Sequence, residues 1–122
     1  MNRVFQVAFH VPGTLSANLS IVWAAPFNCQ LIHVSANGSN ANDGLMTIGT
    51  TTDPDGYVES VAIGDSDTPA EIDTIAEFDG ALADGQYPHI ADGDIIEVVL
   101  DYDGAGGTAT DDFTVVLTFT EG

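Results

Sequence analysis

Positive charge is almost missing from this sequence. One Arg, Arg3, and no Lys stand against 19 Asp and Glu residues, which gives a formal net charge of -18 at pH 7. This surplus repels the phosphates of nucleic acids and the headgroups of anionic lipids, so we expect neither nucleic acid nor membrane as a direct partner. Ion pairs cannot be a major source of stability, because one Arg and three His cannot neutralise 19 carboxylates. The sign instead fits a basic protein surface, bound cations, or a salty medium that screens the repulsion.

Cysteine and long apolar runs are also scarce. Cys29 is the only Cys, which excludes an intrachain disulfide and a Cys-based zinc site. Its neighbours Leu31 and Ile32 predict a buried, inert thiol. No apolar stretch approaches the roughly 20 residues that a membrane-spanning helix needs, and no basic-then-apolar secretory signal follows the first Met. We therefore expect a soluble chain that is made in a cytoplasm.

The remaining composition is that of one folded domain over residues 1–122. The hydrophobic fraction is 44% and the mean hydropathy is +0.15, values that exclude a disordered acidic tail. Most of the acidic residues are Asp, which hydrogen-bonds to nearby backbone in turns and is unfavourable inside helices. The acidity therefore indicates a turn-rich chain.

Alternation of apolar and polar residues, broken by Gly, Asp, Asn and Pro, predicts short strands. We predict them at residues 4–11, 19–24, 30–36, 45–49, 95–102 and 113–120. Residues 57–63 fit either a short helix or a strand, and residues 71–78 fit an edge strand. The last two strands, joined by the glycine-rich residues 103–107, predict a β-hairpin.

Seven or eight short strands without a long helix predict an all-β fold, a two-sheet antiparallel β-sandwich. We favour a jelly-roll-like topology over an immunoglobulin-like one. The connections vary greatly in length, and the Cys…Trp…Cys signature of immunoglobulin domains is missing.

Paired acidic residues and the three histidines are the candidate metal ligands. Several carboxylates that converge with carbonyl oxygens can hold calcium, but Asp residues that cap their own turns explain the same pairs, and no segment has the EF-hand spacing. The histidines have neither close spacing nor a Cys partner. We therefore predict no metal site and no cofactor from these residues, which are Asp53 with Asp55, Asp65 with Asp67, Asp92 with Asp94, Asp101 with Asp103, Asp111 with Asp112, and His10, His33 and His89.

Catalytic patterns are missing too. The serines lie in loops outside any G-x-S-x-G turn, and the glycines of residues 104–107 precede neither the Lys nor the helix of a phosphate-binding loop. We predict no enzyme activity and no catalytic residue. Sugar binding on exposed aromatic rings remains an alternative, with Tyr87 as the best exposed candidate and Trp23, Tyr57 and Tyr102 as further ones.

Segments spread over most of the chain resemble small virion proteins of tailed bacteriophages. They are residues 48–50, 53–57, 86–94 and 118–122, the last of which reads Thr-Phe-Thr-Glu-Gly. The nearest class is the capsid decoration, or cement, protein. The resemblance implies a β-sandwich that binds the major capsid protein on the outside of an icosahedral head, often as a homotrimer, and stabilises the shell. It carries over no functional residue.

Two functions therefore stand as hypotheses. The first is a structural decoration protein on the virion surface. The second is a glycan-binding module or a receptor-binding component of a phage fibre. In the first, the strand that begins near Arg3 could add to the edge of a neighbour's sheet.

Overall fold

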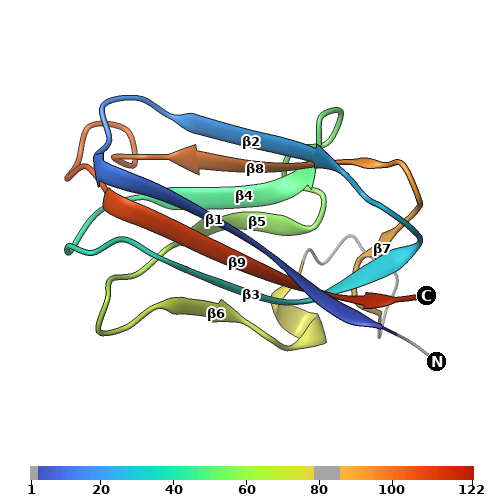
Figure 1. The fold of residues 1–122 in the computed structure, drawn as a ribbon. Helices are drawn as coiled ribbons and strands as arrows, with labels where there is room; N and C mark the ends of the chain where they lie inside the picture. Colours follow the sequence, from blue (N-terminus) through green and yellow to red (C-terminus); the bar gives the residue numbers. More distant parts are fainter. Residues whose placement is uncertain (1–2, 79–85) are drawn as a thin grey trace.

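The structure is a computed structural model that describes residues 3–78 and 86–122. Its strands form two antiparallel sheets packed face to face (Figure 1). The all-β, two-sheet sandwich predicted from the sequence is confirmed. No helix in the described ranges has the length and apolar character to cross a membrane. In chain order the elements are β1 (Val4–Thr14), β2 (Leu19–Ala24), β3 (Cys29–Asn37), β4 (Leu45–Thr50), β5 (Val58–Ala62), β6 (Ala70–Ile72), the 3-10 helix η1 (Ile75–Glu77), β7 (His89–Ile90), β8 (Ile95–Asp101) and β9 (Asp111–Glu121).

Sheet A has the strand order β1-β9-β3-β6, with the short β7 also paired to β3, and sheet B has the order β2-β8-β4-β5. β1 and β2 are the edge strands on one lateral side of the sandwich, where the rings of Phe9 and Trp23 lie 5.3 Å apart. β6 and β5 are the edge strands on the other side. There the backbone N–H of Ala70 donates to the carbonyl of Ile63 across the turn between them.

The core lies between the sheets and follows from the alternation. In the central strand β9, Phe113, Val115, Leu117 and Phe119 point inward and are fully buried, while the Thr residues between them point outward. Sheet B faces them with the buried side chains of β8 and β4. Each such burial contributes about 1.5–3 kcal/mol. The core also buries Cys29, as predicted, and burial raises the pKa of its thiol.

The middle of the chain, which the sequence left open, contains two short strands. Within residues 57–63, Val58–Ala62 form the strand β5 rather than a helix. Residues 71–78 begin with the edge strand β6 and continue as η1, so the predicted strand is confirmed only in its first part. The carboxylate of Glu77 accepts hydrogen bonds from the Thr74 N–H (3.0 Å) and hydroxyl (2.9 Å), which ends the extended run.

The predicted hairpin of the last two strands is wrong. β8 belongs to sheet B, where it pairs with β2 and β4, whereas β9 belongs to sheet A, where it pairs with β1 and β3. The segment between them crosses from one sheet to the other through three residues with positive φ, Gly104, Ala105 and Gly106. The buried Thr110 ends this crossing, and its hydroxyl donates to the carbonyl of Tyr102 at 2.9 Å.

Candidate interaction surface

The carboxylates are unevenly distributed along the chain and over the sandwich. All 19 Asp and Glu residues lie after position 42, the first being Asp43. β1, β2 and β3 therefore carry none. Sequence reasoning treated the charge as a property of the whole chain and missed this division, although the position of the first Asp reveals it.

Between Asp112 and Glu121, which lie near the two ends of β9, the outer face of sheet A has no carboxylate over its three longest strands. Strand pairing places Gln6 of β1 beside Thr118 of β9 and Thr118 beside His33 of β3. The Gln6 amide donates to the Thr118 hydroxyl at 3.1 Å. Two outward rows further along β1, the His10 ring nitrogen Nδ1 lies 2.8 Å from the Thr114 hydroxyl. We call this surface the neutral face; it consists of Val4, Gln6, Ala8 and His10 of β1, Thr114, Val116, Thr118 and Thr120 of β9, and Gln30, His33, Ser35 and Asn37 of β3.

Negative charge begins where the neutral face ends. On the side of β6, Glu71 pairs with Ser35, and its carboxylate lies 3.6 Å from the His33 ring. At the far end of β1, Arg3 donates to Glu121 at 2.6 and 3.2 Å. These hydrogen bonds lower the pKa of Glu121 and raise that of Arg3.

On the lateral side formed by β1 and β2, the inward side chains are partly exposed to solvent. The inward residues of β1 alternate with exposed ones but are only half-buried, and the same holds for β2. Phe5 stacks on the buried Phe119 at 4.9 Å and meets the edge of Phe27 at 5.1 Å. The Arg3 guanidinium lies 4.5 Å above the ring of Phe27. Aromatic rings with an accessible rim are typical of protein-binding surfaces.

The opposite lateral side is short-stranded and acidic. β5 has five residues and β6 three, and Glu59 and Glu71 lie within them. In the turn that joins them, the Asp65 carboxylate accepts hydrogen bonds from the Thr68 N–H and hydroxyl and from the Asp67 N–H. These hydrogen bonds lower the pKa of Asp65.

Asp65, Asp94 and Asp103 each cap a turn of their own, as one of the two sequence interpretations had it, whereas Asp112 bonds segments that are distant in the sequence. Asp94 accepts from the Ala91 N–H, Asp103 from the Ala105 N–H, and Asp112 from the Gly13 N–H and the Ser39 hydroxyl. Within residues 3–78 and 86–122, no group of three or more His, Cys, Asp or Glu side chains is placed to hold a metal ion.

The three histidines, unexpectedly, all lie on or beside the neutral face. His10 pairs with Thr114, His33 with Thr118, and His89 with Gln30 at the end of β3. They occupy three different cross-strand rows, so the structure places them on one surface without bringing them together as ligands.

The aromatic residues considered for sugar binding are engaged in packing. Tyr57 is buried, and Trp23 and Tyr102 are half-buried against the core. Tyr87, which the sequence favours as an exposed ring, is half-buried and meets the ring of Phe78 edge-on at 5.6 Å. The described residues therefore offer no flat exposed aromatic platform.

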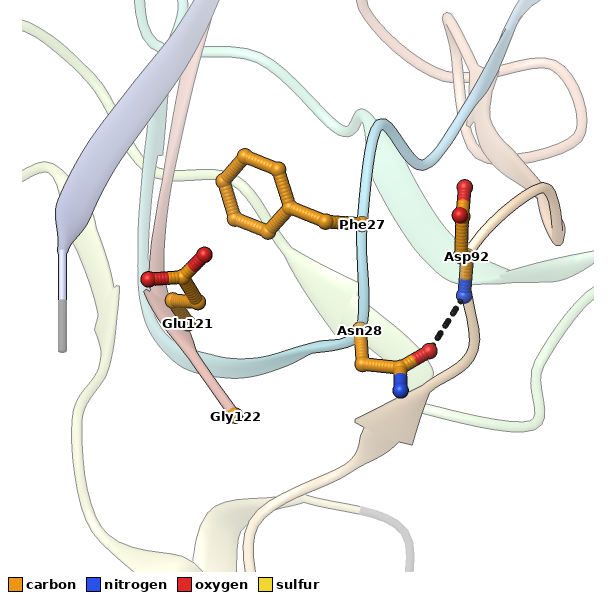
Figure 2. A pocket seen from close by; sticks show the side chains of 5 residues that line it. All are labelled: Phe27, Asn28, Asp92, Glu121 and Gly122. Carbon is orange, nitrogen blue, oxygen red and sulfur yellow. Dashed lines mark hydrogen bonds between the residues drawn. The ribbon is translucent and has the colours of Figure 1, made fainter.

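A depression of about 380 Å³ lies at the end of the sandwich near the C-terminus (Figure 2). It is lined by Phe27, Asn28, Asp92, Glu121 and Gly122. Figure 2 shows Asp92 and Glu121 on opposite sides of the Phe27–Asn28 segment, and the Asn28 side chain accepts a hydrogen bond from the Asp92 N–H at 2.8 Å. Glu121 is paired with Arg3. The polar groups that line the depression therefore connect segments of this protein to one another.

Comparison of the chain with protein-family models, with curated proteins and with solved structures gives no match.

Proposed function

We propose that this chain is a structural virion protein, a decoration protein that binds the major capsid protein on the outside of a tailed-phage head and stabilises the shell. The observation that carries the proposal is the neutral face. In a chain of net charge -18, the three longest strands of sheet A present only uncharged side chains and histidines to the outside between Asp112 and Glu121, near the ends of β9.

A neutral sheet face suits attachment to an assembled protein lattice. Burying a carboxylate without a partner costs several kcal/mol, so an extended contact is least costly where carboxylates are absent. Thr, Gln and Ser side chains can exchange hydrogen bonds with water for hydrogen bonds with a partner. The acids on the other surfaces oppose contact between free copies through those surfaces.

The order of the strands supports the finer proposal that the sandwich is a jelly roll. Eight main strands divide four and four, in the orders β1-β9-β3-β6 and β2-β8-β4-β5. Successive strands alternate between the sheets at both ends of the chain, as the paired Greek keys of a jelly roll require. The topology is used by viral capsid domains and by lectins, so it supports the virion role without deciding it.

The test is binding to phage heads, with a matched pair of variants. Thr118→Glu places a carboxylate in the middle of the neutral face, on the central strand β9. Thr47→Glu is the control. It places the same carboxylate on the outer face of sheet B, since Thr47 lies on β4 between two buried residues. Purified protein is mixed with empty heads of the tailed phage whose genome carries this sequence, and the mixture is sedimented.

We expect the wild-type chain and Thr47→Glu to sediment with the heads, and Thr118→Glu to bind at least 10-fold more weakly, since an unpaired carboxylate at an interface costs more than 1.4 kcal/mol. A chain that does not bind heads, or one that binds equally well with Thr118→Glu, would refute the proposal. A monomer whose tryptophan fluorescence responds to sugars would favour the glycan-binding alternative.

A further inference from the structure

We propose that the free edge of β1 is a docking site for a second copy of this chain, and that the two β1 strands pair antiparallel about a two-fold axis at Ala8. This inference concerns the purified chain alone and does not rest on the proposed attachment to a capsid. It joins three observations: an unpaired strand edge, a sequence that matches itself across that edge, and the place of the only cation.

β1 presents a regular row of unpaired backbone groups. Among the described residues it pairs with β9 alone. The Glu121 N–H donates to the Arg3 carbonyl at 2.7 Å, so by the alternation of an antiparallel pair Phe5, Val7 and Phe9 also turn their backbone groups towards β9. The N–H and C=O groups of Val4, Gln6, Ala8 and His10 therefore point outward (Figure 1 shows β1 with β9 beside it).

The sequence of β1 matches itself around Ala8. Two antiparallel copies can continue one sheet only in a register that pairs inward residues with inward residues. With Ala8 facing Ala8, Phe5 faces Val11, Val7 faces Phe9, and Gln6 faces His10. Aromatic and β-branched side chains are favourable cross-strand neighbours. The pairing covers the half-buried inward residues of β1 and ends at Pro12, which has no N–H to donate.

Charge favours the same partner and the same register. β1 and β2 carry no carboxylate of their own, and the carboxylates that flank β1 are Glu121, bonded to Arg3, and Asp112, bonded to the Gly13 N–H. The register also sets Arg3, whose side chain is 65% exposed, opposite Gly13 of the second copy. The N–H of Gly13 is held by Asp112 at 2.6 Å. Each copy's cation then lies beside the other copy's Asp112, twice in the dimer.

β2 extends the proposed contact surface, and it too is uncharged and partly apolar. It is the edge of sheet B on the same lateral side, with Leu19, Ile21 and Trp23 half-buried and Val22 49% exposed. A dimer that pairs the β1 edges brings the β2 edges near each other. The contact therefore includes apolar side chains of both sheets, as stable interfaces require.

The experiment uses substitutions at the axis. Ala8→Glu places two carboxylates opposite each other, Ala8→Lys places two ammonium groups there, and Ala8→Ser is the uncharged control. Ala8 is exposed, so each variant should fold, which circular dichroism and thermal unfolding verify. The mass in solution is measured by sedimentation equilibrium over a range of concentrations in moderate salt.

We expect wild type and Ala8→Ser to be dimers, and both charged variants to dissociate about 100-fold more readily, because like charges directly opposite are strongly unfavourable. An equimolar mixture of Ala8→Glu and Ala8→Lys should form a mixed dimer, since opposite charges then meet at the axis. A monomeric wild type, a mass of three copies, or Ala8→Glu dimers as stable as wild type would overturn the two-fold pairing. No phage head is present, so this result and the binding test above can fail independently.

Discussion

The edge strands on the two lateral sides of the sandwich differ in length and in charge. On one side, β5 and β6 are short and contain Glu59 and Glu71, and the turn between them holds Asp65 and Asp67. On the other side, β1 runs for 11 residues without a charged side chain, and β2 also lacks one. Short, charged edges oppose the addition of further strands, whereas long, uncharged edges favour it.

This difference teaches where a strongly acidic protein can associate. Repulsion between copies of charge -18 opposes contact over most of the surface. The first 42 residues, which have no carboxylate, provide β1, β2 and β3. The same residues therefore form the only long neutral edge of sheet A within the described chain and most of its neutral face.

The largest expected effect distinguishes the packing beneath the two sides. Phe119 is fully buried and stacks on Phe5, whereas Phe78 lies near the acidic side and meets the ring of Tyr87. Phe119→Ala should lower the free energy of unfolding by about 4–5 kcal/mol and Phe78→Ala by about 3 kcal/mol, the two ends of the range for such truncations. The Phe119 ring packs against the rings of Phe5 and Trp23, whereas Phe78 packs against the ring of Tyr87. Denaturant unfolding measures both, with Thr120→Ala on the outer face as a control that should change it by less than about 0.5 kcal/mol. Equal losses at the two Phe positions would contradict the difference in packing.

The positions of the strands were easier to predict from the sequence than the pairing between them. Alternation identifies which residues of 113–120 point inward, because only one face of a half-buried strand is apolar. It does not identify the strand beside them, so the hairpin prediction failed. β9 pairs instead with β1, more than 100 residues earlier in the chain, as in the pairing of Gln6 with Thr118.

The candidate surface was less predictable for the same reason. The neutral face exists because β1, β9 and β3 are adjacent, a fact of long-range pairing that no local pattern contains. The uncharged Thr side chains of β9 and the free strand near Arg3 were both visible in the sequence. Their place on one sheet was not.

A glycine on each side provides a second, smaller contrast. Gly64 has φ of +78°, and a Cβ there would clash with the Thr68 carbonyl oxygen. Gly13 has φ of +85°, with nothing within 4 Å of the same position. Gly13→Ala should cost about 1 kcal/mol for the left-handed conformation alone, and Gly64→Ala about 3 kcal/mol, because the turn must also shift. Thermal unfolding of the two variants compares them, and a larger loss at Gly13 would be evidence against this account.

Salt should act mainly through the acidic side. Raising NaCl from about 0.05 M to about 1 M should increase the free energy of unfolding by about 1–2 kcal/mol, because screening relieves repulsion among carboxylates that outnumber the Lys and Arg residues 19 to one. KCl is the control and should have the same effect. A midpoint of unfolding that does not move with either salt would show that the acids are too far apart to destabilise the fold.

The smallest effect concerns one carboxylate of the acidic side. Hydrogen bonds from the Thr74 hydroxyl and nearby backbone N–H groups lower the pKa of Glu77 to about 2. Its contribution to stability is therefore complete above its ordinary pKa of 4.5 and is lost as the pH falls through about 2. Carboxyl chemical shifts measured by NMR against pH should show this titration, and Thr74→Ala should return the pKa towards 4.5. A pKa of wild-type Glu77 near 4.5 would contradict the hydrogen bonds between Thr74 and Glu77.

Amide hydrogen exchange along β1 tests most directly whether its uncharged edge is an association site. At about 1 µM the amides of Gln6, Ala8 and His10 should exchange fast, while those of Phe5, Val7 and Phe9, bonded to β9, exchange slowly. At about 1 mM the first three should become slow as well, because the second copy accepts their hydrogen bonds. Exchange of Gln6, Ala8 and His10 that stays equally fast at both concentrations would contradict the account.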